Sequence, residues 1–118
     1  MTGPTLDLAM VGNCQIASLI DRDGTHVWTC WPRFDGDPMF CDLLAGSETP
    51  GRAGRWAIEL IDQASSTQTY ERNTAIVETT LADKEGASLV ITDFCPRFRQ
   101  YERNYRPAML VRIISARR

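Results

Sequence analysis

One loop of the sequence, Trp31-Pro32-Arg33-Phe34-Asp35-Gly36-Asp37-Pro38, combines the side chains that are best suited to chemistry. It holds two aromatic rings, a guanidinium group and two carboxyl groups. The arginine fork can hydrogen-bond hydroxyl groups or a carboxylate in a fixed geometry. Two carboxyl groups can work as an acid–base pair when an apolar enclosure raises the pKa of one of them, but the residues around Asp35 and Asp37 offer no such enclosure. Two acids beside Gly and Pro are typical of a turn, so we predict no catalytic residue in this chain.

A β-hairpin is predicted to hold this loop in place. Two apolar runs, residues 16–20 and 27–31, flank the short acidic turn Asp21-Arg22-Asp23-Gly24. The glycine can take the left-handed conformation that such a turn needs and that a residue with a Cβ adopts only at a cost. The prolines that bound the loop lack the N–H group of a sheet ladder, so the chain must leave the sheet after the second run.

The second half of the chain repeats this pattern. Asp83-Lys84-Glu85-Gly86 matches the first turn, and Phe94-Cys95-Pro96-Arg97-Phe98 matches Cys30-Trp31-Pro32-Arg33-Phe34. From Gly to Pro is 8 positions in the first copy (24 to 32) and 10 in the second (86 to 96). Because the difference is even, corresponding side chains keep the same face of a strand. We interpret the two segments as similar hairpins, and a shared turn chemistry is the simpler explanation of their likeness.

The remaining segments complete a prediction of an all-β fold. Strands are predicted at residues 6–11, 55–60 and 109–114, with one bent strand or two within residues 68–81, a polar turn at 63–67 and a helical turn at 38–45. The sequence therefore predicts an antiparallel β-sandwich in a single domain over residues 1–118. The last strand is apolar and has no partner after it, so Leu110 and Ile113 are candidates for an edge through which copies associate into a homo-oligomer.

Composition and charge limit the classes of partner. The 118 residues carry a net charge of −2, which argues against a nucleic-acid partner. The segment of residues 97–106, rich in Arg and Tyr, is therefore expected to be a solvated or domain-facing surface. No segment approaches the roughly 18 apolar residues of a membrane span, and the first residues lack the pattern of a signal peptide. We expect a cytoplasmic protein with no membrane partner.

The cysteines and the single histidine predict no metal site and no cofactor. Cys14, Cys30, Cys41 and Cys95 form no C-x-x-C pair, and His26 is the only histidine. Structural zinc sites normally show close ligand pairs. In a reducing compartment we expect the four thiols to be reduced and buried as small apolar side chains. We expect His26 to face solvent on a strand beside the hairpin turn.

Several motifs follow one another from about Leu8 to Ile113. They are Gly12-Asn13-Cys14, Trp28-x-Cys30-x-Pro32-Arg33-Phe34-Asp35, Phe40-x-x-Leu43-Leu44, Tyr70-x-x-Asn73-Thr74, Thr92-Asp93-Phe94 and Pro96-Arg97-Phe98. Together they resemble the trehalase-like N-terminal domain of bacterial glycoside hydrolase family 15, the glucoamylases and trehalases. The resemblance implies a β-supersandwich, of which this chain covers the early strands, then a linker and an (α/α)6 barrel. That barrel, which carries the two glutamates of an inverting hydrolysis, has no counterpart in these residues.

The resemblance implies a non-catalytic chain that supports the barrel and shapes the rim of its active site. Arg33 and Asp35 would then offer polar contacts to the barrel or its sugar, and Trp31 or Phe34 a flat apolar contact. The alternative is internal: Arg33 pairs with a carboxylate of its own sheet, and Phe34 belongs to the core. A different class of function also stays open, that of a free-standing carbohydrate-binding or self-associating β-module.

Overall fold

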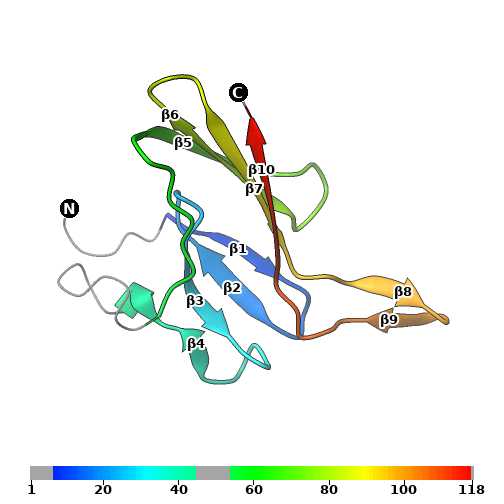
Figure 1. The fold of residues 1–118 in the computed structure, drawn as a ribbon. Coiled ribbons are helices and arrows are strands. Elements are labelled where there is room, and N and C mark those ends of the chain that lie inside the picture. Colours follow the sequence, from blue (N-terminus) through cyan, green and yellow to red (C-terminus); the bar gives the residue numbers. More distant parts are fainter. Residues whose placement is uncertain (1–6, 45–53, 118) are drawn as a thin grey trace.

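The computed structural model describes residues 7–44 and 54–117, which form two four-stranded antiparallel sheets and one separate two-stranded hairpin (Figure 1). Among the described residues the only helical element is a 3-10 turn, η1 (Asp42–Leu44). The predicted all-β class, with antiparallel hairpins and one short helical turn, is confirmed. No helix within the described ranges is long and apolar enough to cross a membrane.

The first sheet follows the chain, because each strand pairs with the next one. Its order is β1 (Ala9–Gly12), β2 (Ala17–Ile20), β3 (His26–Cys30) and β4 (Pro38–Phe40). The predicted hairpin is β2–β3. The Asp21 side chain accepts the backbone N–H groups of Asp23 and Thr25 at 2.9 and 3.0 Å, and Gly24 has a φ of +80°. The acidic turn thus forms as predicted, by hydrogen bonds from its first aspartate.

The second sheet repeats this turn and adds the C-terminal strand at its edge. Its strands are β5 (Gln63–Tyr70), β6 (Val77–Asp83), β7 (Ser88–Phe94) and β10 (Val111–Arg117), in the order β10-β7-β6-β5. The Asp83 side chain accepts the N–H groups of Glu85 and Ala87 at 2.8 and 2.9 Å, as Asp21 does in the first turn. The two turns therefore share one hydrogen-bond pattern. Since β10 pairs only with β7, it leaves one backbone edge open.

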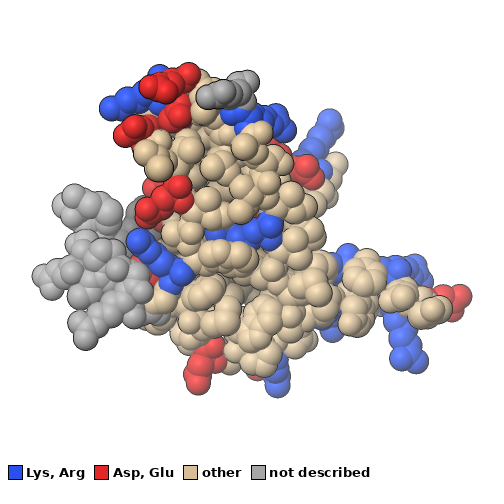
Figure 2. All heavy atoms as spheres, viewed as in Figure 1, with Lys and Arg blue, Asp and Glu red and all other residues tan. Residues whose placement is uncertain are grey.

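A hairpin of its own connects β7 to β10. It consists of β8 (Phe98–Gln100) and β9 (Arg103–Tyr105), and it belongs to neither large sheet. It projects from the body of the molecule (Figure 1) and carries several basic side chains (Figure 2). We call residues 97–106 the arm. The sequence predicted an exposed surface here, but not a hairpin.

The two large sheets face each other across one apolar core, which makes the fold a sandwich. Its buried side chains come from both sheets: Ala9, Val11, Ile16 and Ile20 from the first side, and Val77 and Cys95 from the second, with Trp31 and Leu110 packed against them. Full burial of a side chain of this size is worth about 1.5–3 kcal/mol. The core therefore joins segments that are far apart in the sequence.

Two predictions between the sheets were wrong. Residues 55–60 form no strand and make only one bridge, between Trp56 and His26, whereas the predicted turn at 63–67 belongs to strand β5. The alternating apolar residues of the first segment suggested a strand. The edge strand β5 is polar and mostly exposed, so it lacks the apolar alternation that marks a strand, and backbone pairing with β6 holds it.

The ends of other elements shift by a few residues. The predicted first strand begins at Ala9, and the predicted helical turn at 38–45 starts as β4 before η1 follows. The predicted strand at 109–114 is β10, which runs from Val111 to Arg117. The Gly, Ser, Thr and Pro content of residues 46–54 also predicts an exposed loop, and this segment lies almost entirely outside the described residues.

Candidate functional site

The loop of residues 31–38, here called the Arg33 loop, is held against the turn between β1 and β2. The backbone N–H of Phe34 donates to the carbonyl of Gln15 at 2.7 Å, and the Gln15 side-chain amide donates to the carbonyl of Pro32 at 3.0 Å. Trp31 precedes Pro32 through a cis peptide bond and packs against the core. The backbone of the loop is therefore held at Pro32 and Phe34 by hydrogen bonds, and the packing of Trp31 holds the start of the loop.

The polar side chains of the Arg33 loop face solvent. Arg33 Nη2 donates to Asp35 Oδ2 at 2.9 Å, although the two side chains are 69% and 56% exposed. Phe34 is 60% exposed, and Asp37 is exposed as well. Arg33 therefore pairs within its own loop rather than with the sheet, and Phe34 lies outside the core. Neither carboxyl group has the apolar enclosure that an acid catalyst needs.

A buried asparagine connects the Arg33 loop to the arm. The side-chain amide of Asn13 donates to the carbonyls of Pro96 and Pro107, both at 2.8 Å. Its oxygen accepts the N–H groups of Gln15 and Ile16 at 2.9 and 3.1 Å. Both donors and the acceptor of this side chain are thus used. Because Pro96 and Pro107 lie at the two ends of the arm, Asn13 fixes the arm's root beside the loop.

The neighbours of Asn13 explain the rest of the Gly12-Asn13-Cys14 motif. A Cβ at Gly12 would lie 2.9 Å from the carbonyl oxygen of Ile16, which is too close for any side chain. Cys14 has a φ of 71°, in the left-handed region. The motif is therefore the sequence of a tight turn, with the Arg33 loop on one side and the arm on the other.

The four cysteines are free, but they are not all buried. Cys30 and Cys95 are buried and Cys41 is half-buried, whereas Cys14 is exposed because it sits at the tip of the tight turn. The prediction of burial was therefore wrong for Cys14. Burial, with a smaller effect of the Asp93 carboxylate, raises the pKa of Cys95 to about 12, so this thiol is unreactive. Within residues 7–44 and 54–117, no three His, Cys, Asp or Glu side chains are grouped to hold a metal ion.

His26 is fully buried, and the prediction that it faces solvent was wrong. Its ring Nδ1 lies 2.6 Å from Ser18 Oγ, and its Nε2 lies 3.3 Å from Asp93 Oδ1. Since a carboxylate can only accept, we assign the proton of the neutral ring to Nε2, so that Nδ1 accepts the Ser18 hydroxyl. Ser18 Oγ also lies 2.6 Å from Thr29 Oγ1.

Arg112 completes this group and joins it to three elements. Its Nε donates to Asp93 Oδ1 at 2.7 Å, with side chains that are 1% and 0% exposed. Its other nitrogens donate to the carbonyls of Trp56 and Gly24, and the guanidinium carbon lies 4.9 Å from the centre of the Trp56 ring. The Trp56 ring also stacks on His26, with centroids 5.6 Å apart. We call Ser18, His26, Thr29, Asp93 and Arg112 the buried cluster.

The electrostatics of the buried cluster favour an ion pair beside a neutral histidine. Burial lowers the pKa of His26 below its usual 6.5, and the Arg112 charge lowers it further, while the hydrogen bond to Asp93 opposes both effects. The Asp93 carboxylate is compensated mainly by Arg112, which is the closer partner. The cluster is thus an ion pair with a polar chain attached, all inside the sandwich.

Ser, His and Asp together suggest nucleophilic catalysis, but the geometry of the buried cluster argues for a structural role. All three side chains are at most 1% exposed, so no substrate reaches the Ser18 hydroxyl. Instead, the hydrogen bonds connect the first sheet (β2, β3) to the second (β7, β10). The sequence carried one signal of this cluster: Asp93 and Arg112 interrupt the apolar runs of residues 89–94 and 109–114, where an unpaired charge would be costly.

The residues proposed for association do not form one surface. Leu110 is half-buried and packs against the core, whereas Ile113 on the edge strand β10 is 51% exposed. Its neighbour Ile114 is 53% exposed. Ile113 and Ile114 follow one another in the strand and so point to opposite faces of the sheet, and an apolar contact through β10 would use one of them rather than Leu110.

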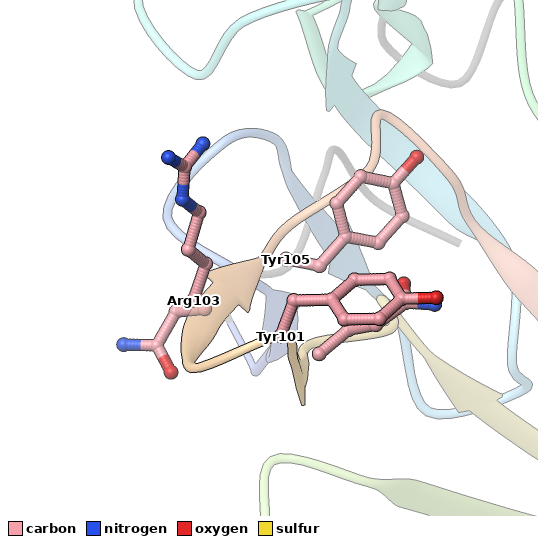
Figure 3. A pocket seen from close by; sticks show the side chains of 5 residues that line it. Tyr101, Arg103 and Tyr105 are labelled. Carbon is pink, nitrogen blue, oxygen red and sulfur yellow. The ribbon is translucent and has the colours of Figure 1, made fainter.

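The arm offers a second group of exposed aromatic and polar side chains. Phe98 and Tyr105 face each other across the hairpin with ring centroids 5.0 Å apart. Near the tip, a hollow of about 420 Å³ is lined by Gln100, Tyr101, Arg103, Asn104 and Tyr105. In Figure 3 the rings of Tyr101 and Tyr105 point to the same side, and Arg103 points away from them. The hollow is open and shallow, as expected of a contact surface rather than an enclosed active site.

These features define a β-sandwich domain with an exposed, anchored loop, a projecting arm and a buried structural cluster. The chain matches the family described as "Trehalase-like, N-terminal" over residues 2–118. It therefore belongs to the trehalase-like N-terminal family, as its motifs predicted. Comparisons with curated proteins and with solved structures give no match.

Proposed function

We propose that this chain is the non-catalytic N-terminal β-sandwich of a family 15 glycoside hydrolase of the trehalase or glucoamylase type. In this proposal it supports an (α/α)6 catalytic domain of the same protein and shapes the rim of its active site. Membership of the trehalase-like N-terminal family supports a parent hydrolase. The four free thiols favour a cytoplasmic location.

The observation that carries the rim role is the state of the Arg33 loop. Its backbone is fixed by two hydrogen bonds with Gln15, yet Arg33, Phe34 and Asp35 are all exposed. Aromatic and arginine side chains on a rigid loop are well suited to contact, because little conformational freedom is lost on binding. The Arg33–Asp35 ion pair also holds the guanidinium group in one orientation.

The proposal predicts that this chain alone does not hydrolyse sugars. Incubation with trehalose, maltose and soluble starch should release no glucose above the buffer control. Sustained glucose release that Asp35→Asn abolishes would show that the Arg33 loop holds a catalytic carboxyl group after all.

In the parent hydrolase, Arg33→Ala and Phe34→Ala should raise KM or lower kcat/KM by roughly 2- to 10-fold, the equivalent of one lost hydrogen bond or apolar contact. Arg72→Ala is the matched control, because Arg72 is exposed in the turn between β5 and β6, away from the loop. Equal kinetics for all three variants and the unaltered protein would refute the rim role.

The alternative function is a free-standing carbohydrate-binding or self-associating β-module. The exposed Ile113 and Ile114 on the edge strand β10 favour self-association. The reading frame beyond Arg118 separates the two proposals. An in-frame barrel supports the hydrolase, and a stop codon at that point supports the module.

A further inference from the structure

We propose that the arm is a docking element whose partner is a second copy of this chain. Its basic and aromatic tip would bind the acidic segment of residues 59–62 on the other copy. This proposal goes beyond the role suggested for the Arg33 loop and does not depend on it.

Among the described elements, none packs against the arm beyond its root, which Asn13 holds. All ten residues from 97 to 106 are exposed, and β8 and β9 pair only with each other. A lone two-stranded hairpin is at best marginally stable in water. Contact with another surface would supply the burial that the arm lacks.

The tip of the arm is built from unusual residues for its turn. Tyr101 and Glu102 connect β8 to β9 with φ values of 51° and 61°, a conformation that Asn-Gly or Gly-Gly normally supplies. A residue with a bulky side chain is strained at a positive φ, and strain of this kind is concentrated at contact and active sites. The result is a tyrosine ring that is 89% exposed at the outermost point of the arm.

The arginines of the arm form no ion pairs with the described residues of the same chain. Four of the described arginines outside the arm have a carboxylate partner: Arg22, Arg33, Arg55 and Arg112. None of the four arm arginines has an ion-pair partner among the described residues: Arg97, Arg99, Arg103 and Arg106. With Glu102 the arm carries a charge of +3. Because the whole chain carries −2, the other residues carry −5. The body of a second copy is therefore an oppositely charged partner.

The segment of residues 59–62 has the features that complement the arm. Ile61 is 85% exposed, and it lies between Glu59 and Asp62, which are both exposed. The Glu59 carboxylate also lies 3.8 Å from Arg55, in an exposed pair that competes only weakly with a second partner. The Gln63 side chain donates to Asp23 at 3.1 Å, which brings a third carboxylate to the same place. An exposed apolar side chain beside carboxylates matches an exposed tyrosine on an arm that carries four arginines, and Tyr and Arg are the residue types that most often dominate binding energy in interfaces.

The two surfaces cannot meet within one molecule. In Figure 1 the arm and the green segment that leads to β5 lie on opposite sides of the body, and in Figure 2 the arm is mainly blue, with a red side chain near its end. The contact is therefore between copies. A two-fold axis lets each copy place its arm on the other, so the dimer closes with two identical contacts and does not grow into a fibre.

Light scattering of this chain should give about twice its mass of 13.3 kDa. The arm variant Arg99→Glu/Arg103→Glu and the body variant Glu59→Arg/Asp62→Arg should each halve the measured mass. Raising the salt from about 0.1 to about 1 M, which shortens the Debye length from ~10 to ~3 Å, should weaken the unaltered dimer. Arg72→Glu/Lys84→Glu is the matched control, with the same change of charge on exposed residues outside both surfaces, and it should stay dimeric.

Mixing the two monomeric variants tests the pairing itself. In the mixture the acidic arm of one variant faces the basic segment of the other, and the basic arm of the second faces the acidic segment of the first. One contact is thus restored with reversed charge and the other with the original charges, so the doubled mass should return. Circular dichroism should show the same fold for all variants, since every substituted side chain is exposed.

Three results would overturn the proposal. One is a monomer at every concentration up to about 1 mM. Another is a dimer that survives both charge reversals but is lost in Ile113→Glu, which would place the contact at β10. The third is an unaltered chain that stays monomeric but binds a single-stranded oligoribonucleotide through Arg99 and Arg103, which would make a nucleic acid the partner of the arm.

Discussion

The molecule contains two Arg–Asp pairs of nearly equal length in opposite surroundings. Arg112 and Asp93 lie 2.7 Å apart with side chains that are 1% and 0% exposed, and Arg33 and Asp35 lie 2.9 Å apart with side chains that are 69% and 56% exposed. The first pair joins strands β10 and β7 under the first sheet. The second pair orders one exposed loop.

The comparison shows that burial, and not the distance between the charges, determines how much an Arg–Asp pair contributes to stability. In water the attraction is screened, and an exposed pair contributes about 0–1 kcal/mol. In the interior, both charges have lost their hydration, so each depends on the other, and removal of one partner costs about 3–5 kcal/mol. The buried pair therefore determines how the two sheets fit together, whereas the exposed pair leaves its groups available for contact.

The largest expected effect follows from breaking the buried pair. Asp93→Asn keeps the shape of the side chain but leaves the Arg112 charge uncompensated, so it should lower the free energy of unfolding by about 3–5 kcal/mol. Urea denaturation followed by fluorescence measures this. The double variant Asp93→Leu/Arg112→Met should recover part of the loss, because it removes both charges together but leaves His26 Nε2–H and the Gly24 carbonyl without these partners. A loss below about 1 kcal/mol for Asp93→Asn would mean that the two pairs are equivalent.

An intermediate effect is expected for the buried but uncharged Asn13. Asn13→Ala removes two hydrogen bonds to the ends of the arm and two within the turn. At about 1 kcal/mol for each bond, and with some replaced by water, the free energy of unfolding should fall by about 2–3 kcal/mol. Ser65→Ala on the exposed side of β5 is the control and should cost less than 1 kcal/mol, as a change at an exposed position with ordinary backbone angles does. Compared with the unaltered chain, Asn13→Ala should show faster hydrogen exchange in the arm and a smaller change in the sheets.

A smaller, pH-dependent effect should come from His26 beside the buried pair. Burial lowers the pKa of His26 below 6.5 in the folded protein, so the unfolded chain binds the proton more readily. The stabilisation is therefore complete above pH 6.5 and is lost as the pH falls below it, by at most about 1.4 kcal/mol per pH unit. Burial raises the pKa of Asp21, which acts in the opposite direction on acidification.

The comparison of His26→Gln with the unaltered chain isolates the histidine, because Asp21 is the same in both. Between pH 7 and 5, the unaltered chain should lose more of its free energy of unfolding than the variant does. Parallel pH profiles would show that His26 does not titrate in this range in either state.

The sequence was enough to predict the fold class and both acidic turns, because these depend on local patterns. Gly24 and Gly86 mark left-handed positions, and the first aspartate of each turn binds the backbone that follows it. Strand β5 could not be predicted in the same way. It is polar on both faces and exists because β6 supplies its hydrogen bonds, so its own residues hold no apolar alternation.

The Arg33 loop was found because its residues stand together in the sequence. The buried cluster was missed because Ser18, His26, Asp93 and Arg112 come together only when the two sheets pack. The burial of His26 is a tertiary effect, since the bridge to Trp56 and the strand β7 cover it. A polar residue in an apolar strand is the only local sign of such a cluster, and the sequence does not say which residues share it.

The smallest effect is expected when the exposed pair is broken. Asp35→Asn should change the free energy of unfolding by less than about 1 kcal/mol, because solvent replaces the lost partner of Arg33. The loop backbone should stay in place, since its hydrogen bonds to Gln15 do not use the Asp35 side chain. In the proposed parent hydrolase the same substitution should lower kcat/KM, because the pair would no longer orient Arg33 for contact. A stability loss close to that of Asp93→Asn would show instead that the exposed pair supports the fold, and the contrast between the two pairs would no longer hold.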